Sequence, residues 1–426
     1  MMAPVSPPAG HLLFRSSNAL MLNTVLTSAL GIGYWVVAAR LFSPGDVGRG
    51  SALVSTMIIL SSFAQLNLTG ALVRFLPVAG AASARFIRLA YGAAAAAAVV
   101  LSATAVAVLP RLVPDLAFLA TNPATGLTFC VGVAVWTVFN LQDAVLTGIR
   151  AAEWVPLENT AYGLLKLVAL VPLLLVPGAG ILLSWVLPLP ILVVAVNVLV
   201  FRRYLAGHVR ATRHRRLRAG RRVVLRFVAV DYVGSVFTQA VPLVLPLLVL
   251  SVAGADHNAY FYVAWVIATG VMTLAHNLAT ALTVEAAHHE EALAVLTRRV
   301  VRRGALLGLP VLFVLLAAPS MVLSVFGGEY GQAVDTLRLL ALSTVPRAVL
   351  ILFSAIARVR NQVALLLLAE VVAGVLTVVL ALWWVDGGGA AGVSLAWLVG
   401  QTAVALAVLP YLRRHMAAPR PAEAAA

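Results

Sequence analysis

The sequence predicts an all-α integral membrane protein of about twelve transmembrane helices, arranged as two six-helix bundles with both termini in the cytoplasm. Hydrophobic residues make up 62% of the 426 residues and charged residues only 11%, whereas about a quarter of a soluble domain is charged. Twelve long apolar stretches follow one another, and the arginines between them lie almost entirely in alternate gaps. We therefore expect the bilayer to surround most of this chain.

The predicted spans are apolar runs of about 20 residues, the length that crosses roughly 30 Å of hydrocarbon. They cover 18–39, 51–72, 87–109, 124–147, 158–177, 181–201, 227–250, 260–284, 304–326, 337–357, 363–385 and 389–411. Gly-containing turns at 177–180 and 386–389 separate the fifth span from the sixth and the eleventh from the twelfth. Prolines inside spans, such as Pro188, Pro310 and Pro346, predict kinks, which a bundle tolerates because neighbouring groups satisfy the freed carbonyls.

The distribution of basic residues predicts the orientation. If the N-terminus is cytoplasmic, 24 of the 30 basic residues lie in inside segments, and only Arg40, Arg49, Arg111 and Arg338 lie outside. Cytoplasmic loops of membrane proteins carry such an excess of arginine and lysine. We expect a cytoplasmic tail at the N-terminus, a bundle, a basic linker, a second bundle and a C-terminal tail. These parts cover 1–17, 18–201, 202–226, 227–411 and 412–426.

The net charge of +15 follows from this orientation and requires no nucleic-acid partner. The basic linker 202–226 is interpreted as a topology signal, and a site for anionic membrane lipids is the alternative. The single cysteine, Cys130, lies inside the fourth span, which excludes a disulfide within the chain and a thiolate metal cluster. The sequence has no P-loop, no paired acidic metal motif and no zinc-ligand spacing. We therefore expect no cofactor, no metal and no enzymatic activity.

The two halves of the chain match each other when the sequence is shifted by 210 residues. Asp46 then matches Asp256, and Asn67 of the second predicted helix matches Asn277. Six helices in each half, both beginning inside, imply parallel repeats related by an axis along the membrane normal, an arrangement used by transporters. A substrate path would lie between the halves, with Asn67 and Asn277 as candidate substrate contacts.

Ionisable residues inside the predicted spans are functional candidates because a polar group in the bilayer is costly. Lys166, which is the only lysine of the chain, and Arg347 are the candidate cations for substrate binding. Asp143, Asp231 and Glu370 are candidate sites for a proton or a coupling cation. Two structural alternatives apply to Lys166: its side chain reaches toward the cytoplasmic interface, or it forms an ion pair with Asp143 on the adjacent helix.

Two stretches resemble bacterial polysaccharide-biosynthesis membrane proteins. They are NALMLNTVLTSALGIGYWVVAARLFSPGDVGRGSALVS near the N-terminus and FNLQDAVLTGIRAAEWVPLENTAYGLLKL around the fourth and fifth spans. The group is the oligosaccharide-lipid flippase branch of the multidrug/oligosaccharidyl-lipid/polysaccharide (MOP) exporter superfamily. The resemblance implies two six-helix bundles around a V-shaped cavity and alternating access. It also implies a cationic cavity for a diphosphate, to which Arg15 and Arg74 belong by their places near the inner ends of the first two helices.

Two functions agree with these features, and a third is disfavoured by them. The first is a flippase that moves a polyprenyl-diphosphate-linked oligosaccharide across the bacterial cytoplasmic membrane for surface polysaccharide synthesis, with a polysaccharide polymerase or glycosyltransferases as possible partners. The second is a cation-coupled multidrug antiporter of the same superfamily, which would depend on the acidic candidates. The third, a membrane glycosyltransferase or polymerase, is disfavoured by the absence of acidic motifs and of a large outer loop.

Overall fold

The computed structural model describes residues 9–176, 178–212, 241, 244–288, 293–360 and 362–416. Over these residues the chain forms α-helices and short helical turns, and no strand occurs among them. The chain divides into two compact units, Met1–Gln239 and Ala240–Ala426, which we call unit 1 and unit 2. The predicted all-α fold class is confirmed.

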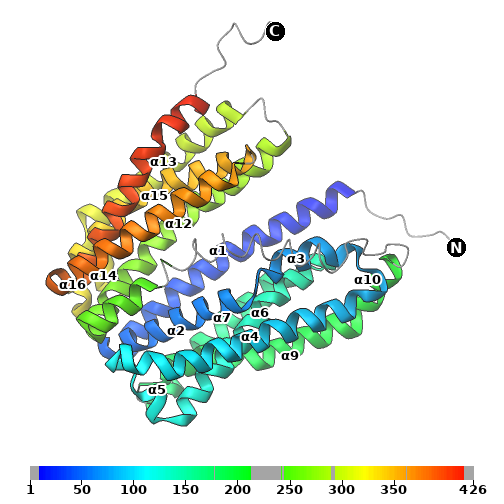
Figure 1. The fold of residues 1–426 in the computed structure, drawn as a ribbon, viewed down its shortest axis with the longest axis horizontal. Helices are drawn as coiled ribbons and strands as arrows, with labels where there is room; N and C mark the ends of the chain where they lie inside the picture. Colours follow the sequence, from blue (N-terminus) through cyan, green and yellow to red (C-terminus); the bar gives the residue numbers. More distant parts are fainter. Residues whose placement is uncertain are drawn as a thin grey trace, which may run out of the picture. The chain divides into compact units, whose positions relative to one another are not determined.

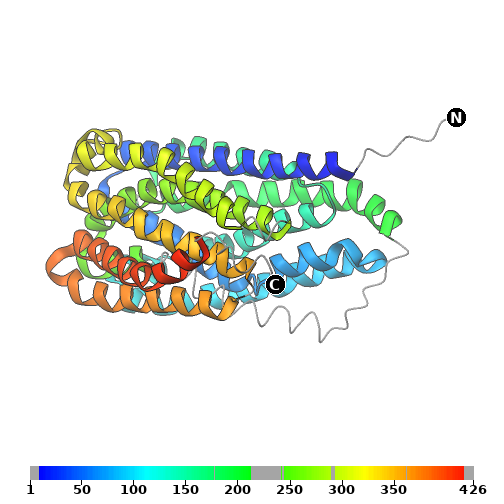
Figure 2. The same cartoon turned by 90° about the horizontal axis from the view of Figure 1, so that it is seen from above.

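Unit 1 is a bundle whose long helices run side by side, parallel or antiparallel to one another (Figures 1 and 2). Its described helices are α1 (Ala9–Leu41), α2 (Pro44–Ala64), α3 (Leu68–Phe75), α4 (Ser83–Leu112), α5 (Phe118–Thr121), α6 (Pro123–Gly148), α7 (Trp154–Ala169), α8 (Gly180–Val186), α9 (Pro188–Leu199) and α10 (Leu205–Thr212). A π-helical turn, Val200–Tyr204, joins α9 to α10.

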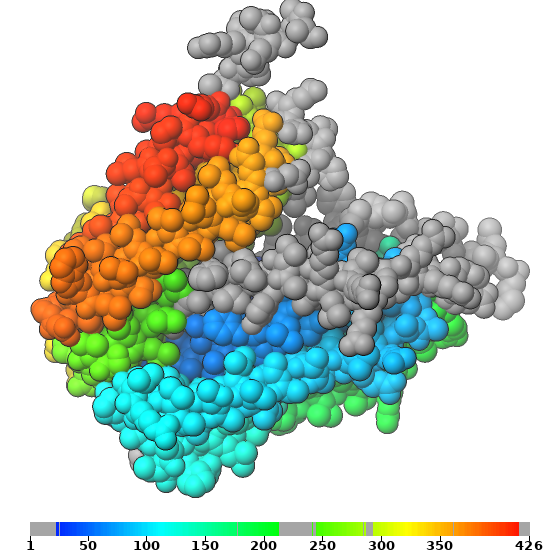
Figure 3. Space-filling view, in the orientation of Figure 1, coloured from blue at the N-terminus to red at the C-terminus, as the bar shows by residue number. Residues whose placement is uncertain are grey.

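Unit 2 contains an apolar helix at Val244–Ala253 and five further described α-helices. These are α12 (Ala255–His288), α13 (Leu293–Ala317), α14 (Pro319–Ser324), α15 (Val334–Val359) and α16 (Val363–Met416). The helix α16 is two arms joined at Gly389, whose φ of 50° and ψ of −132° are not helical. The Tyr411 hydroxyl donates to Gln362 Oε1 over 2.6 Å, so the arms run antiparallel, and their side chains form one continuous surface (Figure 3).

Eight helices of the described residues are long and apolar enough to cross a membrane. The eleventh and twelfth predicted spans are the two arms of α16, which confirms the turn predicted at 386–389. The first span overlaps the shorter apolar helix Leu26–Leu41, and the fifth overlaps α7 and a turn of 3₁₀-helix. Most of the seventh span, 227–250, lies outside the described residues. By length and composition the described helices are those of a multi-pass membrane protein, and they follow the order of the predicted spans.

The second predicted span differs from the expectation because its helix breaks. The helix α2 ends at Ala64 and α3 begins at Leu68. Between them Leu66 and Asn67 adopt left-handed φ values of 48° and 54°. Such a conformation costs of order 1–3 kcal/mol for a residue other than glycine, although asparagine tolerates it better than most. No such break occurs in α12, the matching helix of unit 2, so the two repeats differ here.

Local sequence signals determine where several helices begin. Ser43 caps α2 by accepting from the Asp46 amide, and Pro44 follows at the first helical position. Asn122 caps α6 in the same way, its Oδ1 accepting from the amides of residues 124 and 125 at 3.1 and 3.3 Å. Proline is favoured at the first helical position because that residue has no amide to leave unpaired. These caps fix the starts of helices that carry candidate residues.

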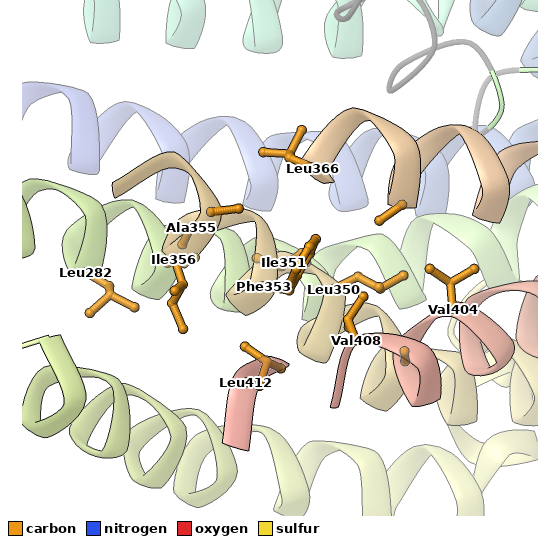
Figure 4. Close-up of a cluster of buried hydrophobic side chains, with 14 of the residues drawn as sticks. Leu282, Leu350, Ile351, Phe353, Ala355, Ile356, Leu366, Val404, Val408 and Leu412 are labelled. Atoms are coloured by element: carbon orange, nitrogen blue, oxygen red, sulfur yellow. The ribbon is translucent and has the colours of Figure 1, made fainter. Parts of the chain in front are cut away.

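Each unit has its own hydrophobic core. In unit 1 a buried cluster joins α3, α4 and α6 to α7 and α9, with Leu72, Ile87 and Leu146 among its fully buried members. In unit 2 the side chains of α15 lie among those of α12 and both arms of α16 (Figure 4). Leu350 and Ile356 of α15 belong to this buried cluster together with Leu282, Val404 and Leu412. The cores hold the helices in a fixed register, which positions the polar groups between them.

Cysteine labelling tests the predicted orientation. In a Cys130→Ala background we expect an Arg210→Cys variant to resist a membrane-impermeant maleimide in intact cells and to react after permeabilisation. Arg111→Cys is the matched control, because Arg111 is also an exposed residue of a helix but lies on the predicted outer side. It should react in intact cells. The opposite pattern of labelling would contradict a cytoplasmic N-terminus.

Candidate functional site

The lysine of unit 1 lies inside a cage of aromatic rings. The Lys166 Nζ atom is 3.8 Å from the centroid of the Trp185 ring, 4.9 Å from that of Tyr34 and 5.2 Å from that of Tyr162. These rings come from α8, α1 and α7, and the lysine is only 7% exposed. Among the described residues no carboxylate forms a salt bridge with Lys166. The side chain is therefore enclosed by aromatic rings, and no carboxylate of the described residues balances its charge.

Hydrogen bonds hold the cage in place. The hydroxyls of Tyr34 and Ser184 are 2.6 Å apart, and the Tyr162 hydroxyl donates to the Trp185 carbonyl over 3.1 Å. A further ring, Trp136 of α6, lies 5.4 Å from Tyr162 and 5.6 Å from Trp185 between centroids. A cation held over ring faces away from water gains about 2 kcal/mol. Four helices thus converge on one buried ammonium group.

The ion pair considered between Asp143 and Lys166 does not form. Asp143 Oδ2 instead accepts a hydrogen bond of 3.1 Å from Asn159 Nδ2. The reason is the register of the α6–α7 hairpin, whose turn contains Ala151. Asp143 and Asn159 each lie eight residues from Ala151, whereas Lys166 lies about 10 Å farther along α7 than Asn159. The same register places Lys166 level with Trp136.

A second polar group in unit 1 consists of Asp143, Glu158 and Tyr91, from α6, α7 and α4. Asp143 Oδ1, both carboxylate oxygens of Glu158 and the Tyr91 hydroxyl are buried, and none has a hydrogen-bond partner among the described residues. Glu158 is only 4% exposed. The three side chains lie close enough to interact electrostatically: Asp143 with Glu158, and both carboxylates with the Tyr91 hydroxyl. We call these three residues the acidic cluster.

Buried polar atoms almost always have a partner, so the unpaired oxygens of the acidic cluster indicate that something else satisfies them. A bound proton on one carboxyl group, or a small cation between the oxygens, would do so. Sequence reasoning identified Asp143 but not Glu158. An acidic residue in the first turns of a helix is usually solvated, and only the hairpin register shows that Glu158 faces Asp143.

The two charged candidates of unit 2, Arg347 and Glu370, pair with each other. The Arg347 Nη1 atom of α15 lies 2.9 Å from Glu370 Oε2 on the first arm of α16. It also donates to Gln401 Oε1 of the second arm over 3.4 Å, and the Ser354 hydroxyl donates to Glu370 Oε1 over 3.5 Å. The two charged side chains are 11% and 12% exposed. Arg347 and Glu370, expected to have separate roles, therefore form one neutral pair.

The remaining candidates lie in varied surroundings. Asn67 occupies the break between α2 and α3, and its buried Nδ2 atom has no hydrogen-bond partner among the described residues. Arg74 is an exposed residue of α3 whose guanidinium lies 5.6 Å from the Phe75 ring centroid. Asn277 is exposed on α12. Asp231 lies outside the described residues, as does the side chain of Arg15. Their roles stay predictions.

Solved structures of known proteins have this arrangement of helices. An inward-facing multidrug resistance MATE family transporter of the MOP superfamily aligns with a TM-score of 0.70 at 17% identity, over 95% of this chain and 98% of its own. The lipid II flippase MurJ, in an inward closed conformation, aligns with a TM-score of 0.71 at 10% identity, over 93% and 87%. The fold is that of the MOP superfamily transporters.

A third structure with the MOP fold, a MOP superfamily transporter from Pyrococcus furiosus described as having a binding pocket of reverse polarity, aligns with a TM-score of 0.59 at 16% identity over 95% of both chains. No protein-family model matches this chain, and no curated protein sequence matches it. These likenesses show the fold of the chain. Its function has to be argued from the polar groups of this chain.

The pair in unit 2 yields a stability prediction. Removing one member of a buried ion pair costs about 3–5 kcal/mol because the other charge stays buried, whereas replacing both by apolar residues is often neutral. We therefore expect Arg347→Met and Glu370→Met each to lower the melting temperature of the purified protein. The double variant should recover most of the loss. If the double variant lowered the melting temperature by as much as the two single variants added together, the pair would not act as a unit.

Proposed function

We propose that this protein is an alternating-access exporter for a polyprenyl-diphosphate-linked oligosaccharide. It would move this lipid across the bacterial cytoplasmic membrane in the pathway that builds a surface polysaccharide. The observation that carries the proposal is the buried ammonium of Lys166, which has ring faces around it and no carboxylate partner among the described residues. A cation kept in the membrane without an anion is costly, and such residues belong to substrate or ion paths.

The chemistry of the aromatic cage favours an anionic cargo. A diphosphate offers the ammonium several oxygen acceptors, and such charge-assisted hydrogen bonds are about twice as strong as neutral ones. Cation–π contacts are worth less, so the ammonium of Lys166 exchanges ring faces for phosphate oxygens when the cargo enters. A cationic drug would instead be repelled by Lys166. The resemblance of the two sequence stretches to oligosaccharide-lipid flippases points to the same cargo.

In this proposal the acidic cluster couples export to an ion gradient across the membrane. Asp143 and Glu158 would take up a proton or a monovalent cation from one side of the membrane and release it on the other. Their unpaired buried oxygens support this role, because an occupant is needed to satisfy them. The cluster and the cage are both attached to α6 and α7, since Glu158 and Lys166 belong to α7 and Asp143 and Trp136 to α6. Occupation of one site can therefore affect the other through these helices.

A transport assay in proteoliposomes tests the cargo. The purified full-length protein should move a fluorescent undecaprenyl-diphosphate oligosaccharide to the opposite leaflet, where a membrane-impermeant quencher reports it. Liposomes with the Lys166→Met variant are the matched control and should show only the background rate. Absence of movement by the wild-type protein under both a proton and a sodium gradient would contradict the proposal.

The acidic cluster also supports a second candidate, a cation-coupled multidrug antiporter. Carboxylates attract a cationic drug, and a drug and a coupling ion could compete for them. Ethidium uptake into the same proteoliposomes separates the two candidates. Uptake of ethidium driven by an imposed gradient, without movement of the lipid-linked oligosaccharide, would favour the antiporter.

A further inference from the structure

The helix α13 of unit 2 is not packed along its middle. Its buried residues are Leu293, Thr297 and Leu315, so none lies in the long stretch between the last two. In unit 1 the third long helix, α4, buries a residue at nearly every turn from Ser83 to Ser102. The difference leaves a groove in unit 2 where unit 1 has close helix packing.

The groove lies between α13 and the neighbouring helices α12 and α15, which are labelled in Figure 1. It has a volume of about 270 Å³, and its walls include Gly304 and Gly308 of α13, Ala275 and Leu278 of α12, and Ala348 and Leu352 of α15. Its one hydroxyl, that of Thr344, already donates to a backbone carbonyl over 2.6 Å. An apolar space of this kind holds hydrocarbon, not water.

The two glycines form open notches in the wall of the groove. A Cβ atom at Gly304 would meet only Leu278 Cδ1 at 3.6 Å, and one at Gly308 would meet nothing within 4 Å among the described residues. The notches are one helical turn apart, about 6 Å along α13. A straight acyl chain leaves such notches empty and loses dispersion contacts, whereas methyl branches fill them. The wall therefore suits a methyl-branched chain.

Two arginines of α13 lie on the helix stripe that leads into the groove, although they are not among the residues that line it. Side chains three or four residues apart lie on the same face of a helix. Arg298 and Arg302 are therefore on the same face of α13 as Ala305 and Leu309, and both of the latter line the groove. Arg299 and Arg303 fall on a different stripe, with Leu306, which does not line it. All four arginines are exposed. Arg298 and Arg302 thus offer guanidinium groups beside the mouth of an apolar groove, where a phosphate would bind.

We infer that this groove binds the isoprene units next to the diphosphate of a polyprenyl diphosphate, with Arg298 and Arg302 contacting its phosphates. The inference rests on the proposed function, because it assigns the lipid part of that cargo to unit 2. It places the start of recognition on the side of the membrane where these arginines are predicted to lie, the cytoplasm.

Titration with defined lipids tests this assignment. The full-length protein in phosphatidylcholine nanodiscs is titrated with undecaprenyl diphosphate and, separately, with phosphatidylglycerol. We expect undecaprenyl diphosphate to bind more tightly than phosphatidylglycerol. Arg298→Gln/Arg302→Gln should weaken the binding of undecaprenyl diphosphate about tenfold, as the loss of charge-assisted bonds predicts. Gly304→Phe, which fills a notch, should weaken it to a similar degree.

Two matched variants separate the groove from general effects. Arg299→Gln/Arg303→Gln removes the same charge from another stripe of α13, and Leu306→Phe adds bulk at an exposed position outside the groove. Neither should change the affinity. Equal sensitivity of both arginine pairs, or equal affinity for phosphatidylglycerol, would overturn the assignment.

The outcome is distinguishable from a failure of the proposed function. Loss of selective binding in a protein that still moves the lipid-linked oligosaccharide would overturn only the groove. Selective binding that depends on Arg298, Arg302 and Gly304, in a protein that moves no oligosaccharide, would support the groove and contradict the export.

Discussion

Lys166→Met is expected to reduce export of the lipid-linked oligosaccharide by roughly 10- to 100-fold while the protein stays folded in the membrane. The range corresponds to the loss of a hydrogen bond to a charged group, about 1.5–3 kcal/mol. Methionine has a similar length and makes favourable contacts with aromatic rings, so the cage of Tyr34, Tyr162 and Trp185 should keep its packing. The measurement is the rate of movement in proteoliposomes, together with complementation of a polysaccharide-deficient deletion strain.

Two further variants separate charge from packing. Lys166→Ala leaves a cavity between α1, α7 and α8 and should lower the melting temperature as well as export. Lys166→Met should lower export alone. If the methionine variant exported normally while the alanine variant failed, Lys166 would be a packing residue of the cage, and the cargo would have to bind elsewhere.

The span pattern was predictable because hydropathy and arginine placement act locally along the chain. The turn between the arms of α16 follows from the run of glycines that ends at Gly389. Glycine adopts the backbone angles of residue 389 without strain, whereas other residues do not. The break at Leu66 and Asn67 was not predictable, since neither residue marks a stop in an apolar run. Its cost is met by packing that only the folded unit provides.

The partners of the polar residues depended on helix register, which spans and topology do not specify. Asp143 and Lys166 lie in adjacent helices, and the spacing along each helix alone does not decide whether they form an ion pair. The hairpin register about Ala151 decides it in favour of Asn159. The predicted spans leave 148–157 between these helices, and a count outward from the middle of that gap places Tyr162, not Asn159, opposite Asp143. The pairing with Asn159 therefore did not follow from the spans. Arg347 and Glu370 belong to helices joined by a short connection, and the same count brings them close.

Glu158→Gln is expected to abolish the stimulation of export by an ion gradient and, at the same time, to raise the melting temperature of the protein. Both carboxylate oxygens of Glu158 are buried and unpaired among the described residues. A neutral amide needs neither a bound proton nor a cation to avoid a buried charge, which is why stability rises. An amide cannot take up and release a proton, and it attracts a cation far less, which is why coupling is lost.

Proteoliposomes with an imposed proton gradient or an imposed sodium gradient measure the coupling, and export without a gradient gives the baseline. Asp143→Asn should behave like Glu158→Gln, because Asp143 is close enough for its charge to affect Glu158. Tyr91→Phe is the matched control: it removes an unpaired hydroxyl from the same cluster without changing a carboxylate, so gradient stimulation should persist. Gradient-stimulated export at the wild-type level in both carboxylate variants would exclude the acidic cluster as the coupling site. The coupling ion would then have to bind outside the described part of unit 1 or in unit 2, where the carboxylate of Glu370 is already paired with Arg347.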